Sequence, residues 1–254
     1  MRLSSSLKSG RSLYTDQSGL GMIRRDWVEE LSLSGNHFPV TQAVYLQDQG
    51  HRLSLVVDHA TGASSVQEGM LEVMVDRRTM YDDARGMGEG VTDSRATTHG
   101  YWLLLEARDP SSTPAPDTLA SLSPLGTVLS RYLDNPVTVL SAQSPASQPT
   151  VSLLQSPLPC DHHLVNLRSW TPRTLSPLSA LMILQRTGPD CGWASLTLSD
   201  CVSPTPTPNI YWRHVSSSAK YNPVSLTGNF DSPRVGSLFN LSPMEIAAYN
   251  VTFS

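Results

Sequence analysis

The chain has 254 residues, a formal net charge of -4 at pH 7 and only 16% charged residues, and no basic run or stripe argues for a nucleic-acid partner. No stretch approaches the roughly 20 consecutive apolar residues with which a helix spans a bilayer. Its 19 prolines, with many Ser and Thr and few Glu, Lys and Ala, favour strands and turns over helices.

The amino-acid pattern predicts short strands that are separated by turns and loops rich in proline and glycine. In chain order, we expect strands at 13–27 (two strands around a glycine turn), 40–46, 52–57, 70–75, 99–106, 137–141, 164–167, 180–185, 193–198, 210–214 and 246–253. The small residues of 60–69 indicate a loop, and 125–133 a short helix. Many short strands with almost no helix indicate an all-β fold of β-sandwich modules.

One stretch, 75–90, concentrates charge directly after an apolar strand and ends in three glycines at alternate positions, Gly86, Gly88 and Gly90. A strand that leads into a polar, glycine-rich loop can hold side chains over a cleft. Glycine also permits backbone conformations that a side chain forbids. From composition alone, a solvated loop closing a hairpin is the favoured interpretation.

Two groups of side chains invite a catalytic or metal-binding interpretation. Asp82 and Asp83 are adjacent, so on a strand they point to opposite faces, which suits poorly the carboxyl pair about 5–5.5 Å apart of a retaining glycosidase. Asp161 and His163 share a strand face around His162, but zinc takes three or four ligands. We therefore interpret these histidines as surface or core residues and assign neither a catalytic nor a metal-binding residue.

The chain has three cysteines, Cys160, Cys191 and Cys201, so they cannot all pair internally. Cys191 and Cys201 flank a predicted hairpin, and a disulfide between them would stabilise the fold by about 2–3 kcal/mol and fit an oxidising lumen. Three reduced, buried thiols are the alternative. Two N-glycosylation sequons, at Asn240 and Asn250, agree with a secretory route without deciding it.

Eight short stretches carry a resemblance to a known family. They are Tyr14-Thr15-Asp16, Asn36 to Pro39, Tyr45 to Asp48, Gly62 to Ser65, Asp76 to Arg78 with Asp82 to Gly86, Leu158 to Asp161, Asp190 to Gly192, and Ser242 to Ile246. In this order they resemble the C-terminal β region of the class II α-mannosidases, glycoside hydrolase family 38, and most of all the Golgi α-mannosidase II branch.

This resemblance implies β-sandwich modules similar to the galactose mutarotase fold. It implies a C-terminal fragment: 1–108 is a sandwich portion truncated at its N-terminus, 109–150 a Pro/Ser-rich insertion with the short helix, and 151–254 the C-terminal β portion. The first nine residues would then form an internal strand. In the family, the nucleophile and the zinc ligands belong to an N-terminal α/β domain, so this chain alone would bind no zinc and hydrolyse nothing.

The implied whole enzyme is a zinc-dependent retaining glycosidase of the Golgi membrane or lumen that removes α-linked mannose from N-glycans. Its implied partners are the missing catalytic domain and a mannose-containing N-glycan, and a homodimer is compatible with the resemblance. Without the catalytic domain, the chain should expose a large apolar face and be marginally soluble.

In the family, an Asp-Asp-x-Arg-Gly loop reaches back to the active-site cleft. The resemblance therefore implies that Arg85 and Gly86 approach the sugar, with Asp82 and Asp83 positioning Arg85 or contacting the other domain. Ala84 departs from the polar residue usual there, which weakens any direct transfer of sugar contacts. A structural ion-pair network at a domain interface is an equally supported and compatible interpretation.

An alternative function is a stand-alone carbohydrate-binding or structural β-sandwich without catalysis. Binding modules of this kind present exposed aromatic rings on which sugars stack. The candidates for such a platform are Trp170, Trp193, Tyr211, Trp212 and Tyr221, and their exposure would discriminate between the two functions.

Overall fold

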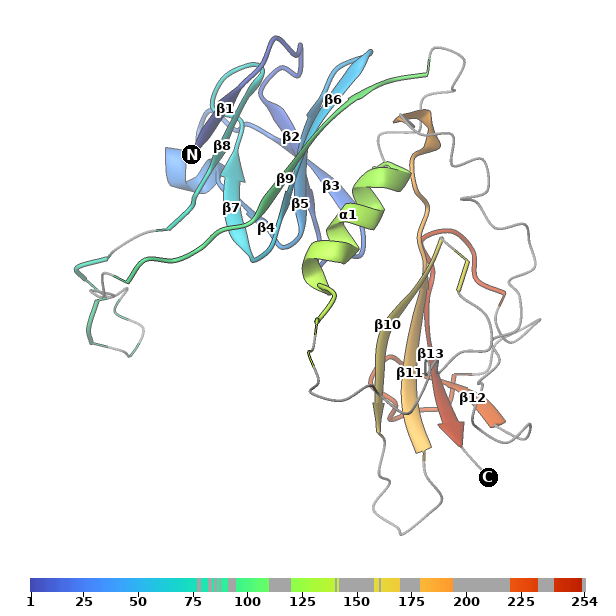
Figure 1. Cartoon of the computed structure of the whole chain (residues 1–254). Helices are drawn as coiled ribbons and strands as arrows, with labels where there is room; N and C mark the ends of the chain where they lie inside the picture. Colours follow the sequence, from blue (N-terminus) through green and yellow to red (C-terminus); the bar gives the residue numbers. More distant parts are fainter. Residues whose placement is uncertain are drawn as a thin grey trace. The chain divides into compact units, whose positions relative to one another are not determined.

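The computed structural model describes residues 1–76, 79–81, 84, 86, 88–90, 95–109, 120–139, 141, 158–159, 161–169, 179–193, 220–232 and 240–252. The chain forms two compact units (Figure 1). The first unit contains Met1–Val137 and Asp190–Thr197, and the second contains Thr138–Pro189 and Leu198–Ser254. The chain thus leaves the first unit after Val137 and returns to it at Asp190.

The first unit contains two antiparallel sheets. The four-stranded sheet has the order β1 (Arg2–Ser4), β8 (Met70–Val73), β7 (Thr61–Ser64), β4 (Phe38–Val40). The five-stranded sheet has the order β3 (Met22–Asp26), β2 (Ser12–Asp16), β5 (Ala43–Gln47), β6 (His51–Val57), β9 (Tyr101–Ala107). A short 3₁₀ helix, η1 (Leu33–Asn36), precedes β4.

The core of the first unit lies between the two sheets. Side chains two residues apart on β6, Leu53, Leu55 and Val57, face Ala63 and Leu71 of the four-stranded sheet in one buried cluster. Arg52, Ser54 and Val56 of β6 are also buried, because the helix α1 (Pro124–Asp134) packs on the other face of this strand (Figure 1). Burial on both faces explains why this strand alternates less clearly than a solvent-facing strand would.

The helix α1 begins after a serine, a residue type that is typical of the N-cap position. The Oγ of Ser123 accepts a hydrogen bond from the backbone N–H of Gly126 at 3.0 Å, and Pro124 takes the first helical position. The Ser130 hydroxyl then donates to Oε1 of Gln42 at 2.8 Å, which ties the helix to the sheet. The helix predicted at 125–133 is therefore confirmed.

The described residues of the second unit form an antiparallel sheet of order β10 (His162–Ser169), β11 (Ser179–Arg186), β13 (Ile246–Thr252), β12 (Lys220–Val224). One face of β11 and β13 buries Met182, Leu184, Tyr249 and Val251 together with Leu241. The 3₁₀ helix η3 (Cys191–Trp193) belongs to the first unit.

Three antiparallel sheets and one α-helix in the described residues confirm the predicted all-β fold. Two local predictions were wrong. The segment 60–69 contains β7 instead of being loop throughout, and 137–139 contains no strand. The predicted strand at 193–198 has its first residue, Trp193, in a 3₁₀ helix, and the rest of it lies outside the described residues, as does the predicted strand at 210–214. No helix in the described part of the chain is long and apolar enough to cross a membrane.

Candidate functional site

The segment between β8 and β9 contains the predicted cleft loop. Asp82, Asp83 and Arg85 lie outside the described residues, whereas Gly86 is described and has a φ of 120°, a conformation that favours glycine. A Cβ added to Gly86 would meet no atom within 4 Å. The backbone conformation at Gly86, and not a close neighbour, is thus what favours glycine there, and the proximity of this residue to a sugar stays a prediction.

Near this segment, a carboxylate joins two stretches of chain that are distant in sequence. Asp58, which follows β6, accepts a hydrogen bond from the backbone N–H of Gly100 at 2.6 Å and lies 2.5 Å from Nδ1 of His59. Partial desolvation disfavours the charged carboxylate, but these hydrogen bonds outweigh it and lower the pKa of Asp58. Burial, and then the charge of Asp58, raises the pKa of the Tyr101 hydroxyl.

A second set of contacts joins the two ends of the segment itself. The Thr97 hydroxyl lies 3.3 Å from Oδ2 of Asp76, which follows β8, and 3.0 Å from Nε2 of His99, which precedes β9. The His99 ring lies 4.4 Å from the ring of His59. The points at which the chain leaves β8 and enters β9 are thus held together by polar and ring contacts.

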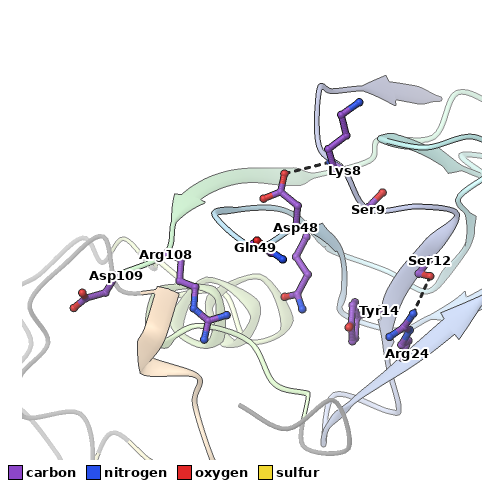
Figure 2. Close-up of a pocket in the computed structure, with 10 residues that line it drawn as sticks. Lys8, Ser9, Ser12, Tyr14, Arg24, Asp48, Gln49, Arg108 and Asp109 are labelled. Carbon is purple, nitrogen blue, oxygen red and sulfur yellow. Dashed lines mark hydrogen bonds between the residues drawn. The ribbon is translucent and has the colours of Figure 1, made fainter. Parts of the chain in front are cut away.

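A pocket of about 640 Å³ lies on the first unit (Figure 2). In Figure 2, Ser12, Tyr14 and Arg24 lie on one side, Arg108 and Asp109 on the other, and Asp48 and Gln49 between them. The lining residues come from the loop before β2, from β2, β3, the β5–β6 turn and the end of β9: Lys8, Ser9, Ser12, Tyr14, Arg24, Gln47, Asp48, Gln49, Arg108 and Asp109.

Asp48 is fixed in the wall of this pocket by backbone donors. Its Oδ1 accepts hydrogen bonds from the N–H groups of Gly50 and His51, both at 2.8 Å, and its Oδ2 accepts one from Lys8 at 3.2 Å. Burial opposes the charged form, but these three bonds lower the pKa of Asp48 below its usual value. The side chain that begins the β5–β6 turn is therefore a positioned carboxylate.

The opposite wall is held by an ion pair within β3 and by a hydrogen bond to it from β2. Nε of Arg24 donates to Oδ1 of Asp26 at 2.9 Å, and the Ser12 hydroxyl donates to the same oxygen at 2.6 Å. The Ser12 hydrogen bond lowers the pKa of Asp26, burial opposes this, and Arg24 lowers it further. Arg24 thus keeps a counter-charge while its guanidinium lines the pocket.

A stack of aromatic and guanidinium groups lies behind the pocket. The rings of Tyr14 and Tyr45 are stacked with centroids 4.6 Å apart. The Arg52 guanidinium lies 4.1 Å from the centre of the Tyr45 ring and 4.5 Å from that of Trp193. The Arg52 side chain is only 2% exposed, so these faces replace much of its water.

Arg52 also binds three separate stretches of chain. It donates to Oε1 of Gln47 at 3.1 and 2.7 Å, to the carbonyl oxygen of Ser121 at 3.0 Å and to Oδ2 of Asp190 at 3.2 Å. These bonds attach the start of the helix segment and the returning chain at 190–193 to the five-stranded sheet. Sequence reasoning missed this residue, because its partners lie far away in the chain.

Glu106, the neighbour of Arg52 in the β6–β9 register, is 1% exposed. Burial raises the pKa of this carboxyl above its usual value, the Ser123 hydroxyl and Arg52 oppose the rise, and Asp190 adds to it. Ionisation of this carboxyl therefore costs free energy in the folded state, although Arg52 lies beside it.

In the second unit, Asp161 and His162 of the predicted Asp161-His162-His163 group have a structural role. Oδ1 of Asp161 lies 2.7 Å from Nδ1 of His162, and Oδ2 accepts a hydrogen bond from Nε of Arg186 at 2.9 Å. Arg186 donates further to the carbonyl oxygen of Leu241 at 2.9 Å. The described residues contain no group of three ligands able to hold a metal ion. His162 is 3% exposed, which agrees with its interpretation as a core residue.

The predicted disulfide and glycosylation sites are only partly described. Cys191 is exposed in η3, and Cys201 lies outside the described residues, so their pairing stays a prediction. Asn240 is exposed. Asn250 lies on β13, between β11 and β12, and its Oδ1 is buried, so of the two sequons Asn240 is the more accessible.

Two of the predicted platform aromatics are described. Trp193 is 1% exposed and lies against Arg52, and Tyr221 packs on the core of the second unit. Trp170, Tyr211 and Trp212 lie outside the described residues. The two described rings therefore form no exposed platform on which a sugar would stack.

Comparison with known proteins identifies relatives of the whole chain. Residues 1–85 match the model of the glycosyl hydrolases family 38 C-terminal domain. The chain is 34% identical to alpha-mannosidase 2 of Homo sapiens over 99% of its own length and 23% of that protein. It is 32% identical to alpha-mannosidase 2 of Spodoptera frugiperda over 100% of its length and 25% of that protein.

A shorter match, 41% identical to alpha-mannosidase 2 of Drosophila melanogaster, covers 42% of the chain and 10% of that protein. The chain thus spans about a quarter of the length of the relatives that match it throughout. Together, these matches confirm the resemblance noted in the sequence, and they identify the chain as a relative of the glycoside hydrolase family 38 α-mannosidases that carries their C-terminal domain.

Proposed function

We propose that this chain is the C-terminal β portion of an α-mannosidase that hydrolyses α-linked mannose in N-glycans, and that it supports the catalytic domain and lends a loop to its cleft. The observation that carries the proposal is the similarity to alpha-mannosidase 2 along 99% of the chain. A zinc-dependent catalytic domain outside this chain and a Golgi location belong to the same proposal.

The proposed contribution of the loop follows from its residue types. The Arg85 guanidinium can donate two parallel hydrogen bonds to sugar hydroxyls or to a carboxylate of the catalytic domain. Gly86 allows the main chain to come close to the ligand, and its φ of 120° agrees with that role. Asp82 and Asp83 would orient the guanidinium. The contacts of Asp58 and Thr97 described above would fix the base of the loop.

Exposed apolar side chains support a partner that covers part of the first unit. Leu103 and Leu105, on the edge strand β9, are 57% and 68% exposed, and Met80 and Tyr81 are 75% and 85% exposed. Exposed apolar groups of this kind mark protein interfaces. We assign them to the catalytic domain of the same enzyme, and a second copy of the chain is the other candidate.

The first test is an assay of the purified chain with an aryl α-mannoside and added zinc. We expect no turnover from a folded sample, because the nucleophile and the zinc ligands are proposed to lie elsewhere. Turnover that depends on zinc and is abolished by a chelator would overturn the proposal that the catalytic residues lie outside this chain.

The role of the loop is tested in the longer protein. Arg85→Ala should lower kcat/KM roughly 100-fold, and Arg85→Lys should restore little of it, because an ammonium cannot make the paired hydrogen bonds. Arg95→Ala is the matched control, since Arg95 is an exposed arginine of the same segment. Equal activities of the Arg85 and Arg95 variants would show that the loop does not contribute to the cleft.

A further inference from the structure

We propose that the pocket of Figure 2 is a binding site for a neutral oligosaccharide, held by hydrogen bonds from the β5–β6 turn. The choice of a mannose-containing sugar as ligand rests on the proposed function. The assignment of a neutral polyol rests only on the side chains that line the pocket.

The pocket has the size and construction of a ligand site. Its volume of about 640 Å³ falls within the range of roughly 300–1,000 Å³ that is usual for small-molecule sites. Its walls come from five separate segments of one compact unit, and two of them are ordered strands, β2 and β3. Walls of this kind are formed before a ligand arrives, so little ordering entropy is lost on binding.

The polar side chains that would face a ligand are held in place by hydrogen bonds from other groups of the protein. Both oxygens of Asp48 accept backbone hydrogen bonds, and Oε1 of Gln47 accepts two hydrogen bonds from the buried Arg52. Arg52 therefore fixes which way the Gln47 amide points, and leaves its Nε2 group as the donor that has no protein partner in the described chain. Gln49, which is exposed, makes no side-chain hydrogen bond to a described residue.

Two amides beside a positioned carboxylate suit hydroxyl groups. An amide offers donors and an acceptor, a carboxylate offers acceptors, and each sugar hydroxyl both donates and accepts. Adjacent sugar hydroxyls can therefore bond to Gln47, Asp48 and Gln49 together. A purely anionic or cationic ligand would leave half of these groups without a matching partner.

The charges around the pocket also favour a neutral ligand. Arg24 is paired with Asp26 at 2.9 Å, and the Lys8 ammonium lies 3.1 Å from Glu68. At the other wall, Arg108 and Asp109 bring one charge of each sign. The site therefore has no strong field of one sign that would concentrate ions.

The expected affinity is low. Tyr14 lines the pocket but is only 6% exposed, and its ring is already stacked on Tyr45, so a sugar gains little from ring contact. Hydrogen bonds exchanged with water contribute modestly each. We expect a dissociation constant of about 1 mM for a trimannoside, which suits a site that retains a glycan already tethered at a second place.

The test is an NMR titration of the ¹⁵N-labelled chain with a branched α-mannotriose. Saturable shifts are expected at the backbone amides of 8–9, 24 and 47–50 and at the side-chain NH₂ groups of Gln47 and Gln49. Binding should change little between about 0.05 and 0.5 M NaCl, because no ion pair forms. A parallel titration with inorganic phosphate should give no saturable shift at these positions.

Gln49→Ala is the informative variant, because its side chain supports nothing else in the described fold. It should raise the dissociation constant at least about fivefold. Gln67→Ala, an exposed glutamine of the same unit that does not line the pocket, should bind like the parent.

The proposal is wrong if mannotriose gives no saturable shift in a folded sample, if Gln49→Ala binds as well as the parent, or if phosphate binds instead. A failure of the mannosidase proposal is distinguishable, because it would appear in the activity assays and not in this titration.

Discussion

Each of the two units buries an arginine against an aspartate, and the two arginines are compensated differently. In the second unit, Arg186 and Asp161 have side chains only 4% and 1% exposed, and His162 occupies the remaining carboxylate oxygen. In the first unit, Asp190 is 11% exposed, and Arg52 relies on two aromatic faces as well as on hydrogen bonds. The buried charge of Arg186 is thus compensated by polar groups that are themselves buried. The buried charge of Arg52 is compensated in part by aromatic rings, and its aspartate partner keeps some access to water.

The largest effect is expected where the pairing is closed. Asp161→Asn removes the charge that faces Arg186 and leaves a buried cation without its counter-ion, which typically costs 3–5 kcal/mol. Hydrogen exchange of the β10 and β11 amides, measured under native conditions, would report the loss in the second unit. Asp26→Asn, at an exposed ion pair, is the control and should cost under about 1 kcal/mol. If Asp161→Asn and Asp26→Asn lowered the stability equally, the buried pairing of Asp161 would not be the stronger contribution.

A smaller effect is expected for Arg52→Met. Methionine keeps the contact with Tyr45 and Trp193, and Asp190 can be hydrated, so we expect a loss of about 2 kcal/mol. Exchange of the β5 and β6 amides should rise, while that of β11 should stay unchanged. A loss as large as that of Asp161→Asn would mean that aromatic contact and water access do not relieve the buried charge of the first unit.

The helix cap should contribute about 1 kcal/mol. Ser123→Ala removes the acceptor for the N–H of Gly126 and one polar neighbour of Glu106. We therefore expect the backbone amides of α1 to exchange hydrogen faster, by the factor that corresponds to this loss of stability. Ser6→Ala, at an exposed serine that caps nothing, is the matched control. An unchanged exchange rate would show that tertiary packing alone holds the helix.

The smallest effect concerns Glu106 and depends on pH. Because burial raises its folded-state pKa, the folded protein keeps this proton at pH values where the unfolded chain has released it. Stability is therefore complete below the unfolded-state pKa and declines as the pH rises through the folded-state pKa.

Glu106→Gln cannot ionise, so its Tm should fall less between about pH 5 and pH 8 than that of the parent protein. Glu30→Gln, at an exposed glutamate, should leave the parent's pH dependence unchanged. A parallel decline in the Glu106 variant would mean that Arg52 keeps this carboxylate charged.

The fold was largely predictable because its strongest signals are local. The apolar content of 40–46, 52–57 and 246–253 indicates β5, β6 and β13, although the predicted strand at 40–46 also includes Val40, the last residue of β4. β7 was missed because Gly62, Ala63 and Ser64 are typical of loops, although Ala63 is fully buried in the core. β12 was missed because it contains Pro223, which edge strands tolerate.

The sites were less predictable for a physical reason. The Gln-Asp-Gln-Gly sequence at 47–50 predicts a turn, and an aspartate that binds the backbone just after it is typical of such turns. Nothing local predicts that the same turn is braced by Arg52. Asp190, a partner of Arg52, is 138 residues further along the chain. The periodic patterns of helices and strands predict no contact over such a separation in sequence.

That separation has a consequence for biosynthesis. A ribosome adding about 5–20 residues per second needs roughly 7–28 s to reach Asp190 after Arg52 has been made. Once β9 (Tyr101–Ala107) has been made, the nascent first unit has all the strands of its two sheets but still lacks Asp190 and Trp193, which contact the guanidinium in the finished protein. The unit is completed only by a segment that follows the inserted residues 138–189. For part of its synthesis, the chain therefore holds the Arg52 guanidinium without the ion pair to Asp190 and without the cover of Trp193.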